Sequence, residues 1–286
     1  MIASLRKWIR GNPGLRSKLI PWWTRAQHLK WLARNIVTFG RPVSCPAGDS
    51  IIRLHPVGQI PEVLWLNDFE LNDRNFVTAY LRPGMQVINI GANVGLYSVL
   101  ASVLVGEKGR VHAFEPSLET YGRLLKNVTL NGCRNVTSVR LALSDAAGTL
   151  VLRADPNHPA LDGHRFVEHI DRAAGLLQTD ELVAAGTLDN YMVEQESQEI
   201  DFMIVDVEGA EFAVLRGAVS TLSRSDPTML LECSRHQADT ENLLRKLGYQ
   251  FWVWDRAAQA LAPTDFQQAA RHGNIIVRRE GWSARP

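Results

Sequence analysis

Cysteine is scarce in this 286-residue chain, and its three cysteines lie far apart. Cys45, Cys133 and Cys233 form no CxxC pair and no metal-finger spacing, which argues against a disulfide framework and a structural zinc site. This cysteine usage predicts a reducing, cytoplasmic setting. Long apolar runs are also missing near the basic N-terminus, because Pro13, Pro21 and several charges interrupt them. We therefore expect neither a signal peptide nor a transmembrane helix.

Acidic residues are absent before Asp49, whereas nine Lys and Arg residues and four tryptophans precede it. Such a composition is typical of a segment that lies on an anionic membrane surface, so it predicts peripheral contact with a membrane or a lipid-linked substrate through residues 1–41. The alternative is a set of amphipathic helices that cap the core or form a dimer contact, which leaves a homo-oligomer open. Nucleic acid is not an expected partner, because no reading module accompanies the charges.

Apolar strand-like runs and helix-like segments alternate from residue 85 to the end of the chain. This alternation predicts a doubly wound, mostly parallel α/β sheet in a domain spanning residues 85–286. Residues 1–48 are predicted to form a basic, Trp-rich helical leader. Residues 49–84 are predicted to connect the two, with a strand pair around "IIRLHPVGQI" and a helix reading "NDRNFVTAYL". The polar stretch of about residues 155–180 is rich in turn formers and is predicted to be a long loop or lid.

A glycine-containing turn, "GANVG", joins the strand "MQVINIG" to an apolar helix. Such a turn places free backbone N–H groups and the positive end of a helix against a ligand, and the missing side chains allow close approach. Gly91 and Gly95 have GxxxG spacing rather than the GxGxxG of a dinucleotide fingerprint. The turn therefore predicts a cofactor without a pyrophosphate.

The next two strands deliver polar side chains to the same edge of the predicted sheet. "HAFEP" places Glu115 about 20 residues after the glycines, where a carboxylate accepts hydrogen bonds from both hydroxyls of a ribose. "LALSD" places Ser144 and Asp145 within reach of a base amino group, although "SDAAG" also makes a good reverse turn. A nucleoside-bearing ligand is the expectation.

Taken together, "INIGANVG", "FEP", "ALSD", "TLD" and "DFMIVDVEGAE" resemble the FkbM family of S-adenosylmethionine-dependent methyltransferases, over roughly residues 83–277. The resemblance implies the Rossmann-like class I methyltransferase fold, with a seven-stranded sheet of order 3-2-1-4-5-7-6, and S-adenosylmethionine as the cofactor. The cofactor-binding positions expected on this basis are Asn89, Gly91, Ala92, Asn93, Gly95, Glu115, Pro116, Ser144, Asp145 and Asp206.

Two positions depart from the family's pattern. The family commonly has Asp where this chain has Asn89, and Lys where it has Ile204. We expect Asn89 to hydrogen-bond the methionine amino group or a water without supplying charge, which would weaken the cofactor's binding. Any catalytic role of that lysine is absent here.

Carboxylates at the ends of two later strands are the candidates for chemistry. Asp206 and Glu232 are predicted to face the crevice as proton acceptors or cation ligands, and His236 is a further candidate base. Glu208 and Glu211 begin the helix after Asp206, where a carboxylate is stabilised by the helix dipole without any function. Carboxylate oxygens suit Mg²⁺, but no ligand spacing defines a site, so no metal residue is assigned.

These features predict an S-adenosylmethionine-dependent O-methyltransferase that acts on a hydroxyl. The resemblance implies a hydroxyl of a sugar in a cell-surface glycan or glycolipid, or of a polyketide-like metabolite, as the acceptor. One alternative is a non-catalytic adapter that binds a membrane or partner. A nicotinamide-dependent oxidoreductase is disfavoured by the glycine spacing and by the lack of a Tyr-xxx-Lys pair. The expected location is cytoplasmic, with the leader favouring the inner face of the membrane.

Overall fold

The computed structural model describes residues 28–57, 59–66, 70–154, 165–169, 176–177, 179–195, 199–233, 235–270 and 273–279. Most of the predicted leader and most of the predicted insertion lie outside these residues. In the part that is described, residues 28–37 form a helix.

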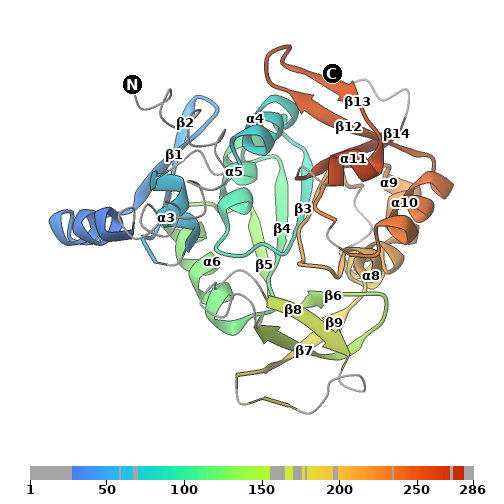
Figure 1. Cartoon of the computed structure of the whole chain (residues 1–286), viewed down its shortest axis with the longest axis horizontal. Coiled ribbons are helices and arrows are strands. Elements are labelled where there is room, and N and C mark those ends of the chain that lie inside the picture. Colours follow the sequence, from blue (N-terminus) through green and yellow to red (C-terminus); the bar gives the residue numbers. More distant parts are fainter. Residues whose placement is uncertain are drawn as a thin grey trace, which may run out of the picture.

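A large sheet forms the centre of the described structure, in the order β13-β12-β14-β11-β10-β3-β4-β5 (Figure 1). Its strands are β3 (Gln86–Ile90), β4 (Arg110–Phe114), β5 (Val136–Val139), β10 (Phe202–Val205), β11 (Thr228–Leu231), β12 (Tyr249–Asp255), β13 (Ala260–Pro263) and β14 (Ile275–Arg279). Without β13, the order counted along the chain is 3-2-1-4-5-7-6, with β14 antiparallel to both of its neighbours. The α/β fold with a large central sheet is therefore as predicted.

Strand β13 is an addition to the seven strands that we predicted. It pairs antiparallel with β12, and Asp255 Oδ1 accepts hydrogen bonds from the amides of Ala257 and Ala258 in the turn between them. Gln259 completes the turn with a positive φ of 49°. The turn contains neither glycine nor proline, which is why the sequence pattern did not indicate a hairpin.

Helices cover both faces of the sheet. Successive residues of the central strands point to opposite sides, and both sets are apolar, so each face has to be buried. Val87 and Phe202 belong to one apolar cluster, and Ile88 and Met203 belong to the other. The first cluster includes α4 (Leu71–Tyr80), α5 (Leu96–Val105) and α6 (Leu118–Leu130). The second includes α7 (Leu188–Glu194), α8 (Glu211–Arg216), α9 (Val219–Ser225), α10 (Gln237–Lys246) and α11 (Phe266–Ala270).

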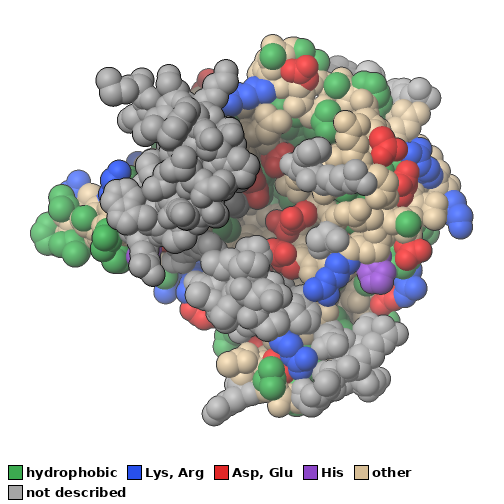
Figure 2. All heavy atoms as spheres, viewed as in Figure 1, with side chains coloured by type: hydrophobic (Ala, Val, Ile, Leu, Met, Phe, Trp, Pro, Cys, Tyr) green, Lys and Arg blue, Asp and Glu red, His purple; other side chains and the backbone are tan. Residues whose placement is uncertain are grey.

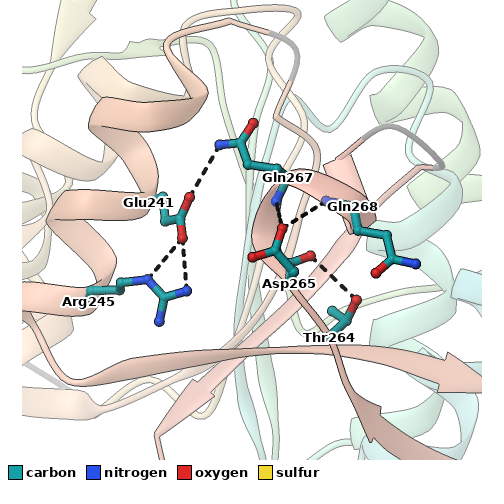
Figure 3. Close-up of polar contacts among 6 residues, drawn as sticks. All are labelled: Glu241, Arg245, Thr264, Asp265, Gln267 and Gln268. Carbon is teal, nitrogen blue, oxygen red and sulfur yellow. Dashed lines mark hydrogen bonds and ion pairs between the residues drawn. The ribbon is translucent and has the colours of Figure 1, made fainter.

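Polar contacts join α10 to α11 on the second face (Figure 3). Asp265 caps α11, because its Oδ1 accepts hydrogen bonds from the amides of Gln267 and Gln268. The Gln267 side chain donates to Glu241 of α10, whose carboxylate also pairs with Arg245 one turn later. These contacts fix the short α11 beside the helix that follows β11.

Between the helix over residues 28–37 and strand β3 lie a hairpin and two further helices, which dock on the first face. Strand β2 (Ser50–Leu54) coincides with the first part of the predicted strand pair, but it pairs with β1 (Val43–Ala47) before it, because the chain turns at Gly48, which has φ 60°. Helix α3 (Gln59–Leu66) begins within the last part of the predicted strand pair. The buried Asn127 links this region to the glycine turn, since its Oδ1 accepts from the amide of His55 and its Nδ2 donates to the carbonyl of Val94.

A second, four-stranded sheet has the order β6-β9-β7-β8. It contains β6 (Ala142–Leu143), β7 (Gly148–Ala154), β8 (Arg165–His169) and β9 (Glu181–Gly186). The prediction of one strand for "NVTSVRLALSD" was wrong: β5 of the large sheet ends at Val139, and β6 joins the smaller sheet. The predicted helix "AEFAVLRGAVSTL" is likewise divided into α8 and α9 at Gly217, where a β-carbon would overlap the carbonyl of Ser144.

Candidate functional site

A crevice lies where β3, β4 and β10 end, beside the glycine turn and β6. Acidic side chains gather near the centre of the face that Figure 2 shows. The crevice is lined by Ile90, Gly91, Asn93, Phe114, Glu115, Pro116, Ser117, Thr120, Leu141, Ala142, Leu143, Leu152, Val167, Asp206, Val207, Glu208 and Ala210. Carboxyl ends of parallel strands are where α/β sheets bind ligands.

The glycine turn is held closely against its neighbours. Gly91 has φ 79°, and a β-carbon there would overlap the carbonyl oxygen of Asp206. Gly95 has φ 89°, and its β-carbon would lie 2.6 Å from a methyl carbon of Leu124 in α6. Asn93 has a φ of 50°, and its Oδ1 accepts a hydrogen bond from the amide of Val94. Packing against the backbone therefore requires Gly91, and the positive φ favours glycine at both positions, whatever the turn binds.

Glu115 is fixed by backbone amides on both sides of its carboxylate. Its Oε2 accepts a hydrogen bond of 3.0 Å from the amide of Asn93, and its Oε1 accepts one of 3.0 Å from the amide of Ser117. The side chain is 8% exposed and lines the crevice. An ionised carboxylate has about four lone-pair sites, so it can accept a hydrogen bond from a ligand hydroxyl as well as from backbone amides. This arrangement suits recognition of a diol such as that of a ribose.

Several predicted cofactor-binding residues lie outside the crevice lining. The side-chain amide of Asn89 donates to Ser98 Oγ at 2.8 Å, and Asn89 is 1% exposed, so its side chain lies behind the turn. Asp145 forms an ion pair with Arg216, and Ser144 is buried beside it. Leu141, Ala142 and Leu143 line the crevice instead, because the chain leaves the large sheet after Val139. In the glycine turn, Ala92 and Gly95 do not line the crevice, whereas Gly91 and Asn93 do. Pro116, which follows Glu115, also lines it.

Asp206, Glu208 and Glu232 form a group of carboxylates whose ligand atoms all lie within 4.8 Å of one another. Burial, followed by the hydrogen bond with Glu232 and that residue's charge, raises the pKa of Asp206 well above its ordinary value. Glu208 has a positive φ of 52° in the turn that leads to α8. Oxygen donors at this spacing suit a proton shared between carboxylates, or a hard divalent cation such as Mg²⁺.

Further acidic residues surround this group, and the sequence pattern did not indicate all of them. Burial raises the pKa of Glu70 to about 7, although the Tyr97 hydroxyl donates to it at 2.8 Å. Burial also raises the pKa of Asp73 to about 6. Glu211 is fully buried and burial raises its pKa to about 7, while its Oε1 accepts from the amide of Gly209. Glu70 and Asp73 lie before the glycine turn in the sequence, where no strand end suggested a functional position.

His236, the other candidate base, is not part of the crevice lining. Its side chain is 60% exposed, and its Nδ1 lies 3.7 Å from Asp239 at the start of α10. The residue has a positive φ of 49°, and its ring lies 6.1 Å from that of Phe212. Asp206 and Glu208 line the crevice, and an oxygen of Glu232 lies within 4.8 Å of theirs, so the geometry favours these carboxylates over His236 as the groups that meet a substrate.

A protein-family model described as "Methyltransferase FkbM domain" matches residues 89–251, which is more than half of the chain. Among curated proteins, the chain is 30% identical over 168 residues to "Methyltransferase sdnD" of Sordaria araneosa, covering 51% of this chain and 64% of that protein. It is 29% identical over 135 residues to "Hexuronic acid methyltransferase AglP" of Haloferax volcanii, covering 47% and 50%. The chain spans between half and two thirds of the length of these relatives.

Solved structures also resemble the chain. A methyltransferase FkbM from Methylobacillus flagellatus aligns with a TM-score of 0.41 and 16% identity, covering 76% of this chain and 54% of that one. Fibrillarin from Aeropyrum pernix, in complex with natively bound S-adenosyl-L-methionine, aligns with a TM-score of 0.38 and 15% identity, covering 69% and 67%.

Proposed function

The chain belongs to the FkbM methyltransferase family, and on this premise we propose that it transfers a methyl group from S-adenosylmethionine to a hydroxyl oxygen. The observation that carries the proposal is the position of Glu115, held by two backbone amides in a crevice that it shares with Asp206. One carboxylate suits the nucleoside end of the cofactor, and the other suits the reacting end.

The charge of the crevice supports this cofactor over a dinucleotide. Glu115, Asp206 and Glu208 line it, and no Lys or Arg is among the described residues of the lining. A pyrophosphate would meet these carboxylates without a basic partner, which is unfavourable. A sulfonium, by contrast, carries a positive charge that the carboxylates stabilise. S-adenosylmethionine therefore fits the site better than NAD.

Distinct groups would hold the two ends of the cofactor. Glu115 would accept hydrogen bonds from the ribose hydroxyls, while the apolar wall of Leu141 and Leu143 would contact the base. The backbone of the turn at Gly91 and Asn93 would bind the methionine portion. When bound, the cofactor supplies an electrophilic methyl group, and the fold's contribution is to align the acceptor with it.

Asp206 and Glu232 are suited to take the proton from the acceptor. Asp206 or Glu232 would take the proton that the acceptor hydroxyl loses as its oxygen gains the methyl group. Burial, with Glu232 beside it, raises the pKa of Asp206 and makes its carboxylate a stronger base than an exposed one. The presence of these carboxylates favours a hydroxyl over a carboxylate as the acceptor. A hydroxyl has a proton that they can take, whereas an acceptor carboxylate has none to lose and would be repelled by the acidic group.

A sugar hydroxyl of a glycan or glycolipid is the acceptor that we favour, ahead of a polyketide-like metabolite. One curated relative is named a hexuronic acid methyltransferase, so the family includes a protein named for a sugar acid. Asp206, Glu208 and Glu232 also suit hydrogen bonds to neighbouring sugar hydroxyls, since carboxylates accept them.

The test is transfer of labelled methyl from S-adenosylmethionine to a panel of glycosides and uronic acids, each compared with its analogue lacking one hydroxyl. Transfer that disappears with a single hydroxyl supports the proposal and identifies the acceptor oxygen. Transfer that instead requires a free carboxylate would contradict hydroxyl methylation. Cofactor binding with no transfer to any class of acceptor would favour the non-catalytic adapter.

A divalent cation held by Asp206, Glu208 and Glu232 would serve the same step by lowering the pKa of the acceptor hydroxyl. The two roles are separated by assays after chelation. Activity lost with EDTA and restored by Mg²⁺ indicates a cation, whereas activity that survives EDTA indicates a carboxylate base.

A further inference from the structure

The helix over residues 28–37 presents an apolar face to solvent. Leu29, Leu32, Ile36 and Val37 are 65%, 44%, 76% and 76% exposed. Residues spaced by three and four lie on one face of a helix, so Leu29, Leu32 and Ile36 form a continuous stripe with Val37 at its edge. Phe39, just beyond the helix, is 95% exposed. We call these five side chains the apolar stripe.

The stripe does not result from a loosely attached helix. On its opposite side, Trp31 is 4% exposed, and its ring lies 5.8 Å from that of Trp65 in α3. His28 hydrogen-bonds Glu62 of α3 at 2.9 Å, and Arg34 donates to the carbonyl of Pro42 at 3.0 Å. The helix is therefore anchored with its one large inward-facing aromatic buried and its aliphatic side chains exposed.

The helix projects from the rest of the molecule, as the blue helix at the left of Figure 1. Hydrophobic side chains cover the same projection in Figure 2. Soluble proteins usually turn the apolar face of a helix toward the core, and a contiguous exposed apolar face marks an interaction site. No helix in the described portion of the chain is long and apolar enough to span a bilayer. The stripe is thus suited to a surface rather than to insertion across it.

The basic residues near the stripe favour an anionic lipid surface over a second copy of this chain as its binding partner. Lys30 and Arg41 are exposed beside it, and residues 1–48 contain nine Lys and Arg and no Asp or Glu. Two copies of this chain meeting on the stripe would bring like charges together. An anionic lipid surface instead accepts the apolar side chains at the headgroup boundary and attracts the basic ones.

We propose that the apolar stripe docks on an anionic lipid membrane, with the helix lying in the plane of the interface. The five apolar side chains enter the boundary between headgroups and acyl chains, while Lys30 and Arg41 meet the lipid phosphates. The proposal is independent of the proposed methyl transfer, because it concerns a surface formed by residues outside the crevice.

The test is co-sedimentation of the full chain with two kinds of vesicle. One contains phosphatidylcholine alone, and the other also contains about 30% phosphatidylglycerol, an anionic lipid that generates a negative surface potential. We expect binding at least tenfold tighter to the anionic vesicles. The pair L32S and I36S removes apolar contact without adding charge, and should weaken that binding at least tenfold. V193S is the matched control, because Val193 is a similarly exposed aliphatic residue, at 69%, on α7. Unchanged thermal unfolding of the pair verifies that it folds.

Three results would overturn the proposal. One is the absence of binding to either vesicle; another is binding that the pair retains in full. The third is a dimer in light scattering that the pair dissociates without any vesicle binding, which would assign the stripe to a second copy of the chain.

Discussion

The amide of Asn93 donates a hydrogen bond to Glu115 Oε2 at 3.0 Å, which joins the glycine turn after β3 to the acidic end of β4. The two features that the sequence suggested separately are thus one unit. A ligand that meets the turn also meets a carboxylate whose position the turn determines.

Replacing Glu115 by Gln should weaken the binding of S-adenosylhomocysteine by roughly ten- to hundredfold. A hydrogen bond to a charged group contributes about 1.5–3 kcal/mol, and the amide that replaces it offers only one acceptor oxygen to the two backbone donors. Calorimetric titration measures the change. Glu119→Gln is the control, since that side chain is 74% exposed on α6 and should leave the affinity unaltered. Equal affinity of E115Q and the wild type would remove Glu115 from the cofactor site.

Glu232→Gln should lower kcat at least about a hundredfold, the range that a positioned acid or base contributes, with little change in the KM for S-adenosylmethionine. The reason is that Glu232 acts on the acceptor proton together with Asp206, whereas Glu115 and the glycine turn supply most of the contacts to the cofactor. Asp239→Asn, a nearby exposed carboxylate, is the control. A variant that loses affinity for the cofactor but keeps kcat would assign Glu232 to binding instead.

Asn89→Asp should not increase the affinity for S-adenosylhomocysteine, although it introduces the residue common in the family. The Asn89 side chain is buried against Ser98 and does not line the crevice. A charge at this position would be desolvated, so the variant should lose stability by about 1–3 kcal/mol at neutral pH. Denaturant unfolding and calorimetry measure the two quantities; a gain in affinity would show that the side chain reaches the ligand.

Stability should fall as pH rises from about 4.5 to 7, in part because of Glu70. The folded state raises the pKa of this carboxyl from 4.5 to about 7, so between these values the unfolded chain has released the proton and the folded protein still holds it. The free energy of unfolding therefore decreases across this range and changes no further above it on account of Glu70. Asp73 and Glu232 add to the effect of burial, while Tyr97 and Arg74 oppose it. Glu70→Gln should therefore be more stable than the wild type at pH 8, by up to about 3 kcal/mol, and similar at pH 4. A parallel pH dependence in both proteins would contradict the assignment.

Two glycines should respond oppositely to alanine. Gly91→Ala should destabilise the fold by more than about 3 kcal/mol, because its β-carbon would overlap the carbonyl of Asp206 and its φ is positive. Gly122→Ala, within α6, meets no atom within 4 Å and should stabilise by about 0.5–1 kcal/mol. Chemical denaturation of the pair tests this. It also follows that Gly91 variants are poor probes of cofactor binding, since the fold itself requires this glycine.

The sequence predicted the parts of the fold that depend on regular patterns. Strands β3, β4, β10 and β11 are short apolar runs bounded by turns, and the family resemblance supplied their order. The break between β5 and β6 was missed, because "VTSVRLALSD" contains no glycine or proline to mark a turn, and only tertiary contacts separate the two strands. That break explains why Leu141 and Leu143, rather than Ser144 and Asp145, line the crevice.

Site residues were predictable where a strand end positions them. Glu115 and Asp206 follow β4 and β10 directly, and both line the crevice. Glu70 was not predictable, because it lies in a left-handed conformation before α4 and reaches the acidic group through tertiary folding. Asn89 carries the family's motif position, yet its orientation depends on Ser98 one helix away, which no local pattern records.

The most direct test of the proposed cofactor is calorimetric titration of the folded wild-type protein with S-adenosylhomocysteine and, separately, with NAD. We predict one-to-one binding of S-adenosylhomocysteine in the micromolar range and none of NAD at the same concentrations. Binding of NAD, or the absence of binding by S-adenosylhomocysteine to the folded protein, would contradict a sulfonium cofactor held between Glu115 and Asp206.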